Sequence, residues 1–306
     1  MRIIVCGVGA IGGTVAAALA LAGQEVVGIA RCAQLDAIRA DPGEIAFRRD
    51  DAILLAIKTQ DTAAALERLR AAGVTTQPVF CAQNGVANER LALRRFPNVH
   101  GVTVMMPAAF LTPGEVAAFS TPRHGVFELG RYPAGRDADD ERMAAALEAG
   151  NVAAFVDEAV MAGKHGKLLL NLRNVLEAAL GPEADSAPFV PPLRAEAEAA
   201  FAAAGIRWRD VGGSDPRRAL MRQAPVEGVG RSGGSSTQSL ARGTGSIETD
   251  WLNGEVVLLG RLHGVPTPAN AFLTALGARL ARDGLRPGAV TPEEIAEGYA
   301  AAGVRG

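Results

Sequence analysis

The sequence predicts an α/β domain built on a doubly wound parallel sheet with an antiparallel edge, followed by an all-helical domain. Over roughly the first 130 residues, short apolar runs alternate with helical periods, which is typical of βαβ units. The strand runs are apolar almost throughout, as at 52–57, and a parallel sheet covered on both faces requires such strands. Beyond about residue 159 nearly every segment has the helical period, so we expect domains at 1–158 and 159–306.

The elements of the sheet domain are expected in a regular order. A first strand at 3–6 leads into a helix that ends at Gly23. Further strands and helices are expected at 25–30, 52–57, from 62, at 79–82, from 88, at 99–105 and at 141–149. After that last helix we expect no further strand.

Two parts of the sheet domain depart from a simple repeat. The connection at 31–50 is short for a doubly wound fold and offers only 44–48 as a weak strand. Runs at 115–120 and 124–129, separated by Thr121-Pro122, predict an antiparallel hairpin at the edge of the sheet.

Composition excludes several classes of function. Lys plus Arg number 31 against 33 for Asp plus Glu, and aromatic residues make up 5%, so we expect no nucleic acid partner. No apolar run reaches the roughly 18 residues of a membrane span, and the start of the chain lacks a secretory signal pattern. Cys6, Cys32 and Cys81 form no Cys-x-x-Cys pair, which fits a reducing cytoplasm. The four histidines show no ligand spacing and are expected at the surface or at helix ends, so no metal is predicted.

A glycine-rich turn follows the first expected strand directly and opens a helix. Its six residues are Gly7, Val8, Gly9, Ala10, Ile11 and Gly12. Gly7 allows a tight turn, Gly9 lets backbone amides approach a pyrophosphate, and Gly12 lets helix and strand pack closely. The anion would lie at the N-terminus of the helix. With both flanking elements present, the turn predicts a Rossmann-like dinucleotide-binding domain rather than a structural turn alone.

The end of the second strand indicates which dinucleotide is bound. An NAD-dependent enzyme has Asp or Glu there for the ribose hydroxyl, whereas this chain has Arg31. Lys58, at the end of the next clear strand, could supply a second cation. The two residues favour the extra phosphate of NADP, although a solvated Arg31 is the alternative.

A polar stripe lies on an otherwise apolar helical segment. Lys167, Asn171 and Asn174 fall on one face at i, i+4 and i+7, with leucines on the other sides. A narrow polar face inside a helical domain needs partners or a ligand, and a lysine held beside a nicotinamide can protonate a carbonyl oxygen. By spacing, Arg173 and Glu177 form a separate solvated ion pair.

Two further ionisable residues leave alternatives open. Lys164 lies one turn before Lys167 on the same face, and the pattern alone does not choose between the two lysines. Glu248 lies where another helix starts near Ser246, and by itself it fits an acid favoured by the helix dipole.

Five separated pieces of the chain resemble the ketopantoate reductase (2-dehydropantoate 2-reductase) family. In order they are the turn at 7–12, Lys58-Thr59-Gln60, Gln83-Asn84-Gly85, Lys167-x-x-x-Asn171, and Ser236 with Glu248 twelve residues later. The resemblance extends over essentially the whole chain. It implies a cytoplasmic oxidoreductase of pantothenate biosynthesis that reduces ketopantoate, a small 2-oxo acid, to pantoate with NADPH.

The resemblance also implies residue roles. Lys167, rather than Lys164, is implied as the general acid, and Glu248 as the carboxylate that contacts substrate and cofactor and holds the lysine. Asn84 is implied at the nicotinamide and the substrate, and Asn171 and Ser236 at polar groups of the substrate. The adenosine phosphate is implied on Arg31 and Lys58.

Departures from the family pattern keep other functions open. A second asparagine is expected eight residues after Lys167, where the chain has Val175. Either Asn174 takes its place, or a hydroxyl contact is lost and the substrate is another 2-oxo acid. The alternatives are a reductase of another oxo acid or an imine on the same fold, and a non-catalytic NADP-binding sensor. The apolar helical domain is compatible with a homodimer.

Overall fold

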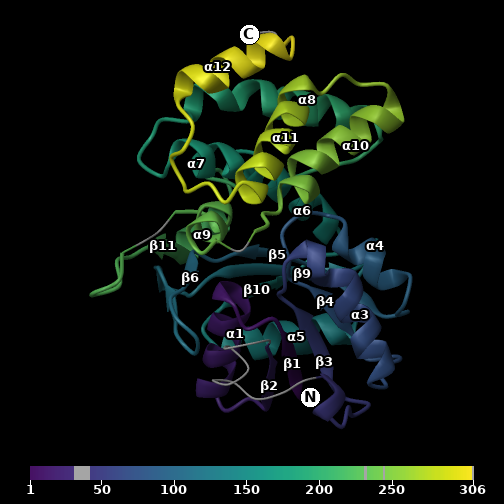
Figure 1. The fold of residues 1–306 in the computed structure, drawn as a ribbon. Coiled ribbons are helices and arrows are strands. Elements are labelled where there is room, and N and C mark those ends of the chain that lie inside the picture. The colour runs from purple at the N-terminus through teal and green to yellow at the C-terminus, as the bar shows by residue number, and fades with distance from the viewer. Residues whose placement is uncertain (31–41, 231–232, 244, 305–306) are drawn as a thin grey trace. The chain divides into compact units, whose positions relative to one another are not determined.

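The structure, a computed structural model, describes residues 1–30, 42–230, 233–243 and 245–304 (Figure 1). The chain divides into two compact units. The first comprises Met1–Lys164 and Asp210–Gly230, and the second comprises His165–Arg209 and Arg231–Gly306.

A seven-stranded sheet forms the centre of the first unit. Its strands are β1 (Ile3–Cys6), β2 (Val26–Ile29), β3 (Ala52–Leu55), β4 (Val79–Cys81), β5 (Val99–Met105), β9 (Val126–Arg131) and β10 (Ala153–Val156). Their order is β10-β9-β5-β4-β3-β1-β2. Strands β1 to β5 pair in parallel, β9 is antiparallel to β5, and β10 is parallel to β9. The predicted doubly wound parallel sheet with an antiparallel edge is confirmed.

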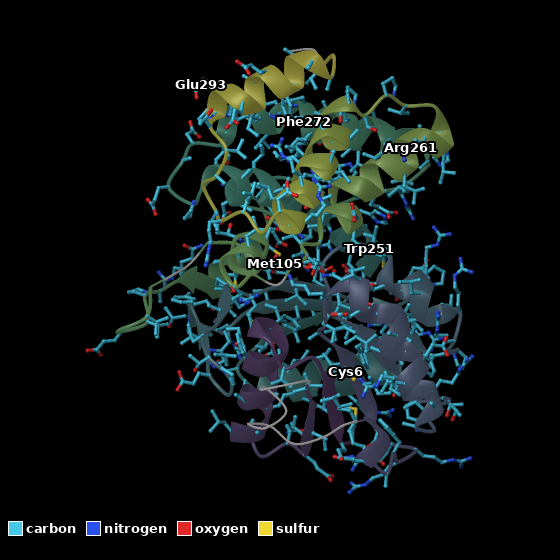
Figure 2. The ribbon with its side chains drawn as sticks, viewed as in Figure 1. Cys6, Met105, Trp251, Arg261, Phe272 and Glu293 are labelled. Atoms are coloured by element: carbon cyan, nitrogen blue, oxygen red, sulfur yellow. The ribbon has the colours of Figure 1, made fainter. Side chains whose placement is uncertain are left out.

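Helices cover both faces of this sheet. They are α1 (Ala10–Leu21) and α5 (Ala138–Ala149) on one face, and α3 (Thr62–Ala71) and α4 (Asn88–Leu93) on the other. Alternate residues of β1 point to opposite faces, so Ile3 and Val5 join one core and Ile4 and Cys6 join the other; Cys6 is labelled in Figure 2. Burial of each large aliphatic side chain contributes about 1.5–3 kcal/mol, which explains why apolar runs occupy the central strands.

The predicted hairpin of 115–120 with 124–129 is wrong. β7 (Val116–Ala118) pairs instead with β6 (Ala108–Phe110), and β9 enters the main sheet beside β5. Every residue of β9 except the last is buried. A strand buried on both faces is stable inside a sheet rather than in a two-stranded hairpin at its edge.

Two smaller expectations also differ from the structure. The weak strand at 44–48 is absent, and a 3₁₀ turn at Pro42–Glu44 precedes irregular backbone there. The strand pattern also continues after α5, because β10 adds to the sheet beyond β9.

Residues 210–230 return to the first unit. Their strand β11 (Met221–Gln223) pairs antiparallel with β8 (Ser120–Pro122). The single boundary expected at 158/159 did not include this return, because the two strands that pair lie about 100 residues apart in the chain.

Arg217 fixes the returning segment through charge. Its guanidinium lies 2.6 Å from a carboxylate oxygen of Glu128 on β9 and 2.8 Å from one of Asp215. The same group lies over the ring of Phe155, 5.5 Å from the centroid. Hydrogen bonding to Asp215 raises the pKa of Arg217 above its ordinary value, so the buried Glu128 faces a permanent cation.

The described part of the second unit contains helices and no strand, as predicted for the helical domain. Its main helices are the end of α6 (Val160–Asn171), α7 (Asn174–Leu180), α8 (Val190–Ala203), α9 (Ser235–Ala241), α10 (Asn253–His263), α11 (Pro268–Arg282) and α12 (Pro292–Ala301). α6 begins in the first unit, whose first stretch ends at Lys164.

Buried amides join three of these helices. The side-chain nitrogen of Asn253 donates to the side-chain oxygen of Asn270 and to the carbonyl of Leu172, both at 3.1 Å. Glu196 accepts from the backbone and side-chain nitrogens of Asn270, at 2.9 and 2.8 Å. These bonds fix α8, α10 and α11 against one another. Among the described residues, no helix is long and apolar enough to cross a membrane.

Candidate functional site

The glycine turn after β1 has the geometry of an anion cradle. Gly7 has φ +95°, and a Cβ on Gly12 would lie 2.0 Å from the carbonyl oxygen of Gly7. Both positions therefore require glycine for the fold itself. A Cβ on Gly9 would meet no atom within 4 Å, so the fold does not explain why glycine is there. The open space leaves room for a ligand to approach the backbone at this position.

The N-terminus of α1 can hold the negative charge of such a ligand. The helix starts at Ala10, and its N-cap, Gly9, supplies no side-chain hydrogen bond. The first amides of a helix have no intrahelical acceptor and carry the positive end of its dipole. A dinucleotide pyrophosphate fits these residues.

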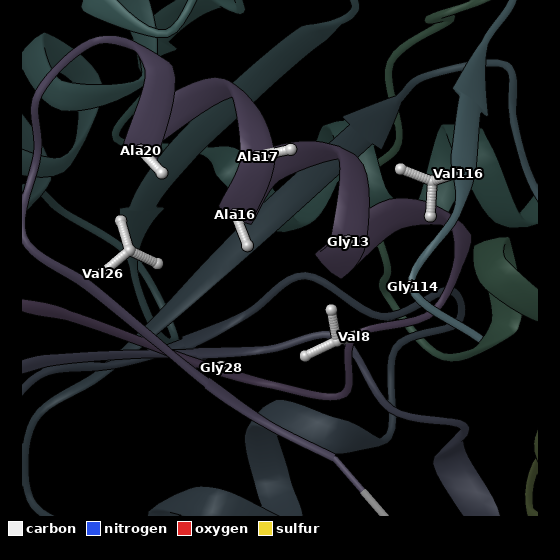
Figure 3. A pocket seen from close by; sticks show the side chains of 9 residues that line it. All are labelled: Val8, Gly13, Ala16, Ala17, Ala20, Val26, Gly28, Gly114 and Val116. Atoms are coloured by element: carbon white, nitrogen blue, oxygen red, sulfur yellow. The ribbon is translucent and has the colours of Figure 1, made fainter. Parts of the chain in front are cut away.

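An apolar pocket of about 250 Å³ lies beside this turn (Figure 3). It is lined by Val8, Gly13, Ala16, Ala17, Ala20, Val26, Gly28, Gly114 and Val116. None of these side chains carries a charge or a hydrogen-bonding group, so the pocket supplies no side-chain ligand for a phosphate.

The turns after β3 and β4 are joined by buried hydrogen bonds around Asn88. Its side-chain nitrogen lies 3.2 Å from both the Thr59 hydroxyl and the carbonyl of Asn84, and its side-chain oxygen accepts from Thr62 at 2.8 Å. Gln83 donates to the same Thr62 hydroxyl at 2.9 Å. The turn with Lys58-Thr59-Gln60 and the turn with Gln83-Asn84-Gly85 are therefore held together. Sequence reasoning missed Asn88, although a buried asparagine at the start of a helix is a signal for such a role.

The predicted cofactor side chains on these turns are partly exposed. Lys58 precedes a 3₁₀ turn three residues after β3, and Asn84 follows β4 by three residues. Both lie beyond the carboxyl ends of parallel strands, where ligands of doubly wound sheets bind. Arg31 lies outside the described residues.

The ammonium group of Lys164 binds to three groups of the first unit. It lies 2.5 Å from Glu89, 3.0 Å from the carbonyl of Cys81 and 3.1 Å from the carbonyl of Gln83. The two carbonyls accept hydrogen bonds from the ammonium group, and Glu89 supplies its counter-charge. These contacts hold Lys164 within the first unit, which favours Lys167 as the residue that faces a substrate.

Lys167 and Asn171 lie one turn apart on α6, so they share a face. The side-chain nitrogen of Asn171 is buried and has no hydrogen-bond partner among the described residues. An unpaired buried donor is costly, and an acceptor on a ligand would satisfy it. The helix predicted to run through Asn174 is wrong in one respect, because α6 ends at Asn171 and Asn174 starts α7.

Ser236 is buried as the second residue of α9. The helix is held by Glu177 of α7, whose carboxylate accepts from the backbone N–H of Gly234 and lies 3.3 Å from the Thr237 hydroxyl. The expected ion pair of Glu177 with Arg173 is therefore wrong, and Arg173 is exposed. A carboxylate at the N-terminus of a helix also stabilises it through the helix dipole.

Glu248 is buried and immediately precedes a 3₁₀ turn at Thr249–Trp251. The next hydroxyl, that of Thr249, is buried with no hydrogen-bond partner among the described residues. A Cβ on Gly277 of α11 would lie 2.4 Å from that hydroxyl oxygen. Close packing on α11 thus fixes the backbone that presents Glu248.

One group of side chains could hold a cation by its spacing. Ligand atoms of His100, Asp137 and Asp140 lie within 4.8 Å of one another. His100 is buried in β5, contrary to the expected surface or helix-end position, with its two ring nitrogens 2.7 Å from Asp140 and 2.9 Å from the side-chain oxygen of Asn98. Asp137 and Asp140 form the capping box at the start of α5. These contacts assign the cluster to helix capping.

Comparisons with known proteins agree across both units. A family model described as "Ketopantoate reductase PanE/ApbA" matches residues 3–134, and one described as "Ketopantoate reductase PanE/ApbA C terminal" matches 166–280. The chain is similar to a PanE/ApbA family ketopantoate reductase from Ralstonia eutropha JMP134, with 27% identity, 92% of this chain and 99% of that chain covered, and a TM-score of 0.73.

Two more distant structures share the fold. A D-mandelate dehydrogenase with NADH and anilino(oxo)acetate has 20% identity, coverage of 93% and 99%, and a TM-score of 0.75. A dimeric ketopantoate reductase from Staphylococcus aureus has 16% identity, coverage of 93% and 100%, and a TM-score of 0.70.

Proposed function

The chain belongs to the ketopantoate reductase family, and we propose that it reduces a small 2-oxo acid, 2-dehydropantoate (ketopantoate), to its 2-hydroxy acid with NADPH. The observation that carries this proposal is the pair on α6. A lysine stands one turn from an asparagine whose buried side-chain nitrogen has no hydrogen-bond partner in the part of the chain that the structure describes. A 2-oxo acid offers a carbonyl oxygen that can receive a proton and a carboxylate that can accept a hydrogen bond from Asn171.

The roles of the residues follow from their chemistry. A nicotinamide dinucleotide held by the turn at 7–12 would supply the hydride that the carbonyl carbon receives. Lys167 donates a proton to the carbonyl oxygen, which prevents a full negative charge from building up there. Asn171 donates to the substrate, and Glu248 contacts substrate and cofactor and helps to hold the lysine in place. The remaining polar contacts to the substrate are assigned to Asn84, Asn174 and Ser236.

The cofactor assignment rests on the two sides of the dinucleotide. The turn at 7–12 is proposed to bind the pyrophosphate, because Gly9 leaves open space there. Arg31 and Lys58 are proposed to bind the phosphate that distinguishes NADP from NAD. The D-mandelate dehydrogenase described above binds NADH, so proteins with this fold can use the other dinucleotide. Comparison of kcat/KM for NADPH and NADH therefore tests the assignment of Arg31 and Lys58 to the extra phosphate.

A second substrate is favoured by one observation. Val175 is buried in α7 at the position where a second asparagine was expected, and its side chain offers no hydrogen bond to a hydroxyl. A 2-oxo acid without the hydroxyl of ketopantoate fits an apolar residue better. The similarity to an enzyme crystallised with anilino(oxo)acetate is consistent with this alternative.

The cellular setting is part of the same proposal. We propose a cytoplasmic enzyme of pantothenate biosynthesis, with ketopantoate as a small-molecule partner. A homodimer is proposed by analogy with the dimeric enzyme from Staphylococcus aureus.

Turnover of oxo acids tests the proposed function. We expect the purified protein to oxidise NADPH with ketopantoate or another member of a panel of 2-oxo acids. Lys167→Ala should lower kcat by about 10² to 10⁴, while the cofactor still binds. Asn171→Ala should mainly raise KM for the oxo acid, because it removes a donor that binds ground state and transition state alike.

Each negative result has a separate meaning. Turnover with another oxo acid but not with ketopantoate would support the proposed reaction and contradict the proposed substrate. No turnover with any oxo acid, despite cofactor binding, would favour the non-catalytic sensor. Full activity of Lys167→Ala would remove the acid role.

A further inference from the structure

We propose that the buried ion pair of Lys164 and Glu89 is a positioning device for the turn that carries Asn84. The pair joins α6 to α4, and both side chains are almost completely buried, at 2% and 0% exposure. This inference rests on the proposed function, since it assumes that Asn84 contacts the cofactor or substrate. Lys164 itself touches neither.

The contacts of the pair are concentrated on one short segment, the turn 81–85. Lys164 donates to the carbonyls of Cys81 and Gln83, at 3.0 and 3.1 Å. The next carbonyl, that of Asn84, accepts from Asn88 at 3.2 Å. Three carbonyls within four residues are therefore held by side chains from outside the turn, and the backbone on both sides of the Asn84 side chain is fixed.

Glu89 supplies the opposite charge beside the lysine. It neighbours Asn88 on α4, so one helix end supplies both the counter-ion of Lys164 and the donor to Asn84. Burial raises the pKa of the Cys81 thiol, the negative charge of Glu89 raises it further, and Lys164 opposes this increase. The raised pKa keeps the thiol neutral, so the thiol does not compete with Glu89 as the partner of Lys164.

Stability alone does not explain such a pair. Replacing a buried ion pair by apolar residues of similar size is often neutral or stabilising, because desolvation offsets the Coulomb attraction. Fixing the turn does explain it, since a side chain that is displaced by about 1 Å can lower a rate about 10²-fold.

The same unit contains a matched control. Arg2 and Asp51 form another buried ion pair, with hydrogen bonds of 2.8 and 2.7 Å. Arg2 precedes β1 and Asp51 precedes β3, so this pair lies at the amino ends of the strands, opposite the end where Asn84 lies. Breaking either pair leaves a buried carboxylate without its cation and destabilises the unit.

The experiment compares three variants, Lys164→Met, Arg2→Met and the double variant Lys164→Met/Glu89→Met. Thermal unfolding, the Kd for NADPH by fluorescence titration, and kcat/KM with the oxo acid that the wild type reduces are measured for each. We expect Lys164→Met to raise the Kd about tenfold and to lower kcat/KM by about 10²-fold. Arg2→Met should lower the Tm to a similar degree with a Kd within about twofold of the wild type.

The double variant separates positioning from stability. It removes both charges, so we expect the Tm to recover towards the wild type, while the Kd and kcat/KM remain impaired because the carbonyls of Cys81 and Gln83 stay without a donor. Recovery of both binding and turnover in the double variant would overturn the positioning role, as would a Kd in Lys164→Met equal to that of Arg2→Met.

The double variant also keeps the test valid if Lys164→Met does not fold. A wild-type protein that binds no nicotinamide dinucleotide would overturn the proposed function. Wild-type binding with unaffected variants overturns only the inference about Lys164.

Discussion

Gly9 and Gly12 show how two residues of one motif can be required for different reasons. A side chain on Gly12 would collide with the carbonyl oxygen of Gly7, at 2.0 Å, whereas one on Gly9 would meet nothing within 4 Å. Gly12 is required by the packing of α1 on the turn, and Gly9 is required by the ligand that we propose there.

Gly9→Ala therefore separates folding from cofactor binding. Gly9 has an extended backbone with φ −90° and ψ −152°, so we expect the free energy of unfolding to fall by about 1 kcal/mol, as for other N-cap positions that are changed to alanine. The Kd for NADPH should rise about tenfold or more, because the new methyl group occupies the space of the pyrophosphate. Gly12→Ala is the control, and it should destabilise the protein strongly. Unchanged cofactor affinity of a folded Gly9→Ala would contradict a pyrophosphate at this turn.

Local residue patterns were predictable, whereas distant partners were not. The glycine turn was predictable because its residues are consecutive and flanked by a strand and a helix. Lys164 looked equivalent to Lys167, because its acceptors, Glu89 and the carbonyls of Cys81 and Gln83, are 75 to 83 residues away in the chain. Spacing on one helix does not indicate which of two lysines an adjacent element will neutralise.

Among the elements, α9 depends on a side chain from another helix. It has seven residues and no side-chain cap of its own, and isolated helices of that length are unstable in water. Glu177 of α7 binds its first turn through Gly234 and Thr237. The position of Ser236 therefore depends on Glu177.

Glu177→Ala should loosen α9 without unfolding the unit. We expect the free energy of unfolding to fall by about 1–2 kcal/mol, as for loss of a helix cap, and amide hydrogen exchange at 233–241 to accelerate. KM for the oxo acid should rise more than kcat falls, because Ser236 is proposed to bind substrate. Glu183→Ala, which removes an exposed carboxylate from the same unit, should change neither. An unchanged KM and unchanged amide hydrogen exchange in Glu177→Ala would show that the position of α9 does not depend on Glu177.

Existence of elements was easier to predict than their pairing. The sequence predicts a strand at 124–129, close to the observed β9, but predicts the preceding run as its partner. Strands that follow each other in the sequence usually lie side by side in a sheet. Here the burial of β9 on both faces requires a place inside the sheet, and the apolar residues of the run carried that information.

At the scale of the whole molecule, buried thiols make stability depend on alkaline pH. Burial raises the pKa of Cys6 from 9.0 to about 12, and burial likewise raises the pKa of Cys81. A raised pKa in the folded state means that the unfolded chain loses its thiol protons first as the pH increases. The stabilisation is complete below about pH 9 and is lost as the pH rises towards 12.

Chemical denaturation between pH 8 and pH 10 measures this effect. Above about pH 9, we expect the free energy of unfolding to fall by up to about 1.4 kcal/mol per pH unit for each thiol. The double variant Cys6→Ala/Cys81→Ala should show a weaker dependence of the free energy of unfolding on pH. At pH 8 it should be less stable than the wild type, because each change to alanine leaves a small cavity in the core. An equally steep decline in the double variant would assign the effect to other groups. Tyr132 and Tyr299, whose pKa values burial also raises, act in the same direction at higher pH.

The two-unit organisation was predictable from the change in period near residue 159, whereas the return of 210–230 was not. That segment is a short strand and a 3₁₀ turn, Pro216–Leu220, within a long helical region. Its attachment depends on Arg217 and on β8, and neither contact leaves a periodic signal in the sequence.

The return of 210–230 has a consequence for protein engineering. The first unit is encoded by two stretches separated by residues 165–209, so no single crossover point exchanges one complete unit for that of a relative. A chimera joined once at Lys164 would take 210–230 from the other parent. Glu128 would then lie against a segment that did not evolve with it, and its ion pair with Arg217 would not be preserved. Recombinants should therefore carry three junctions, with 210–230 inherited from the same parent as the sheet.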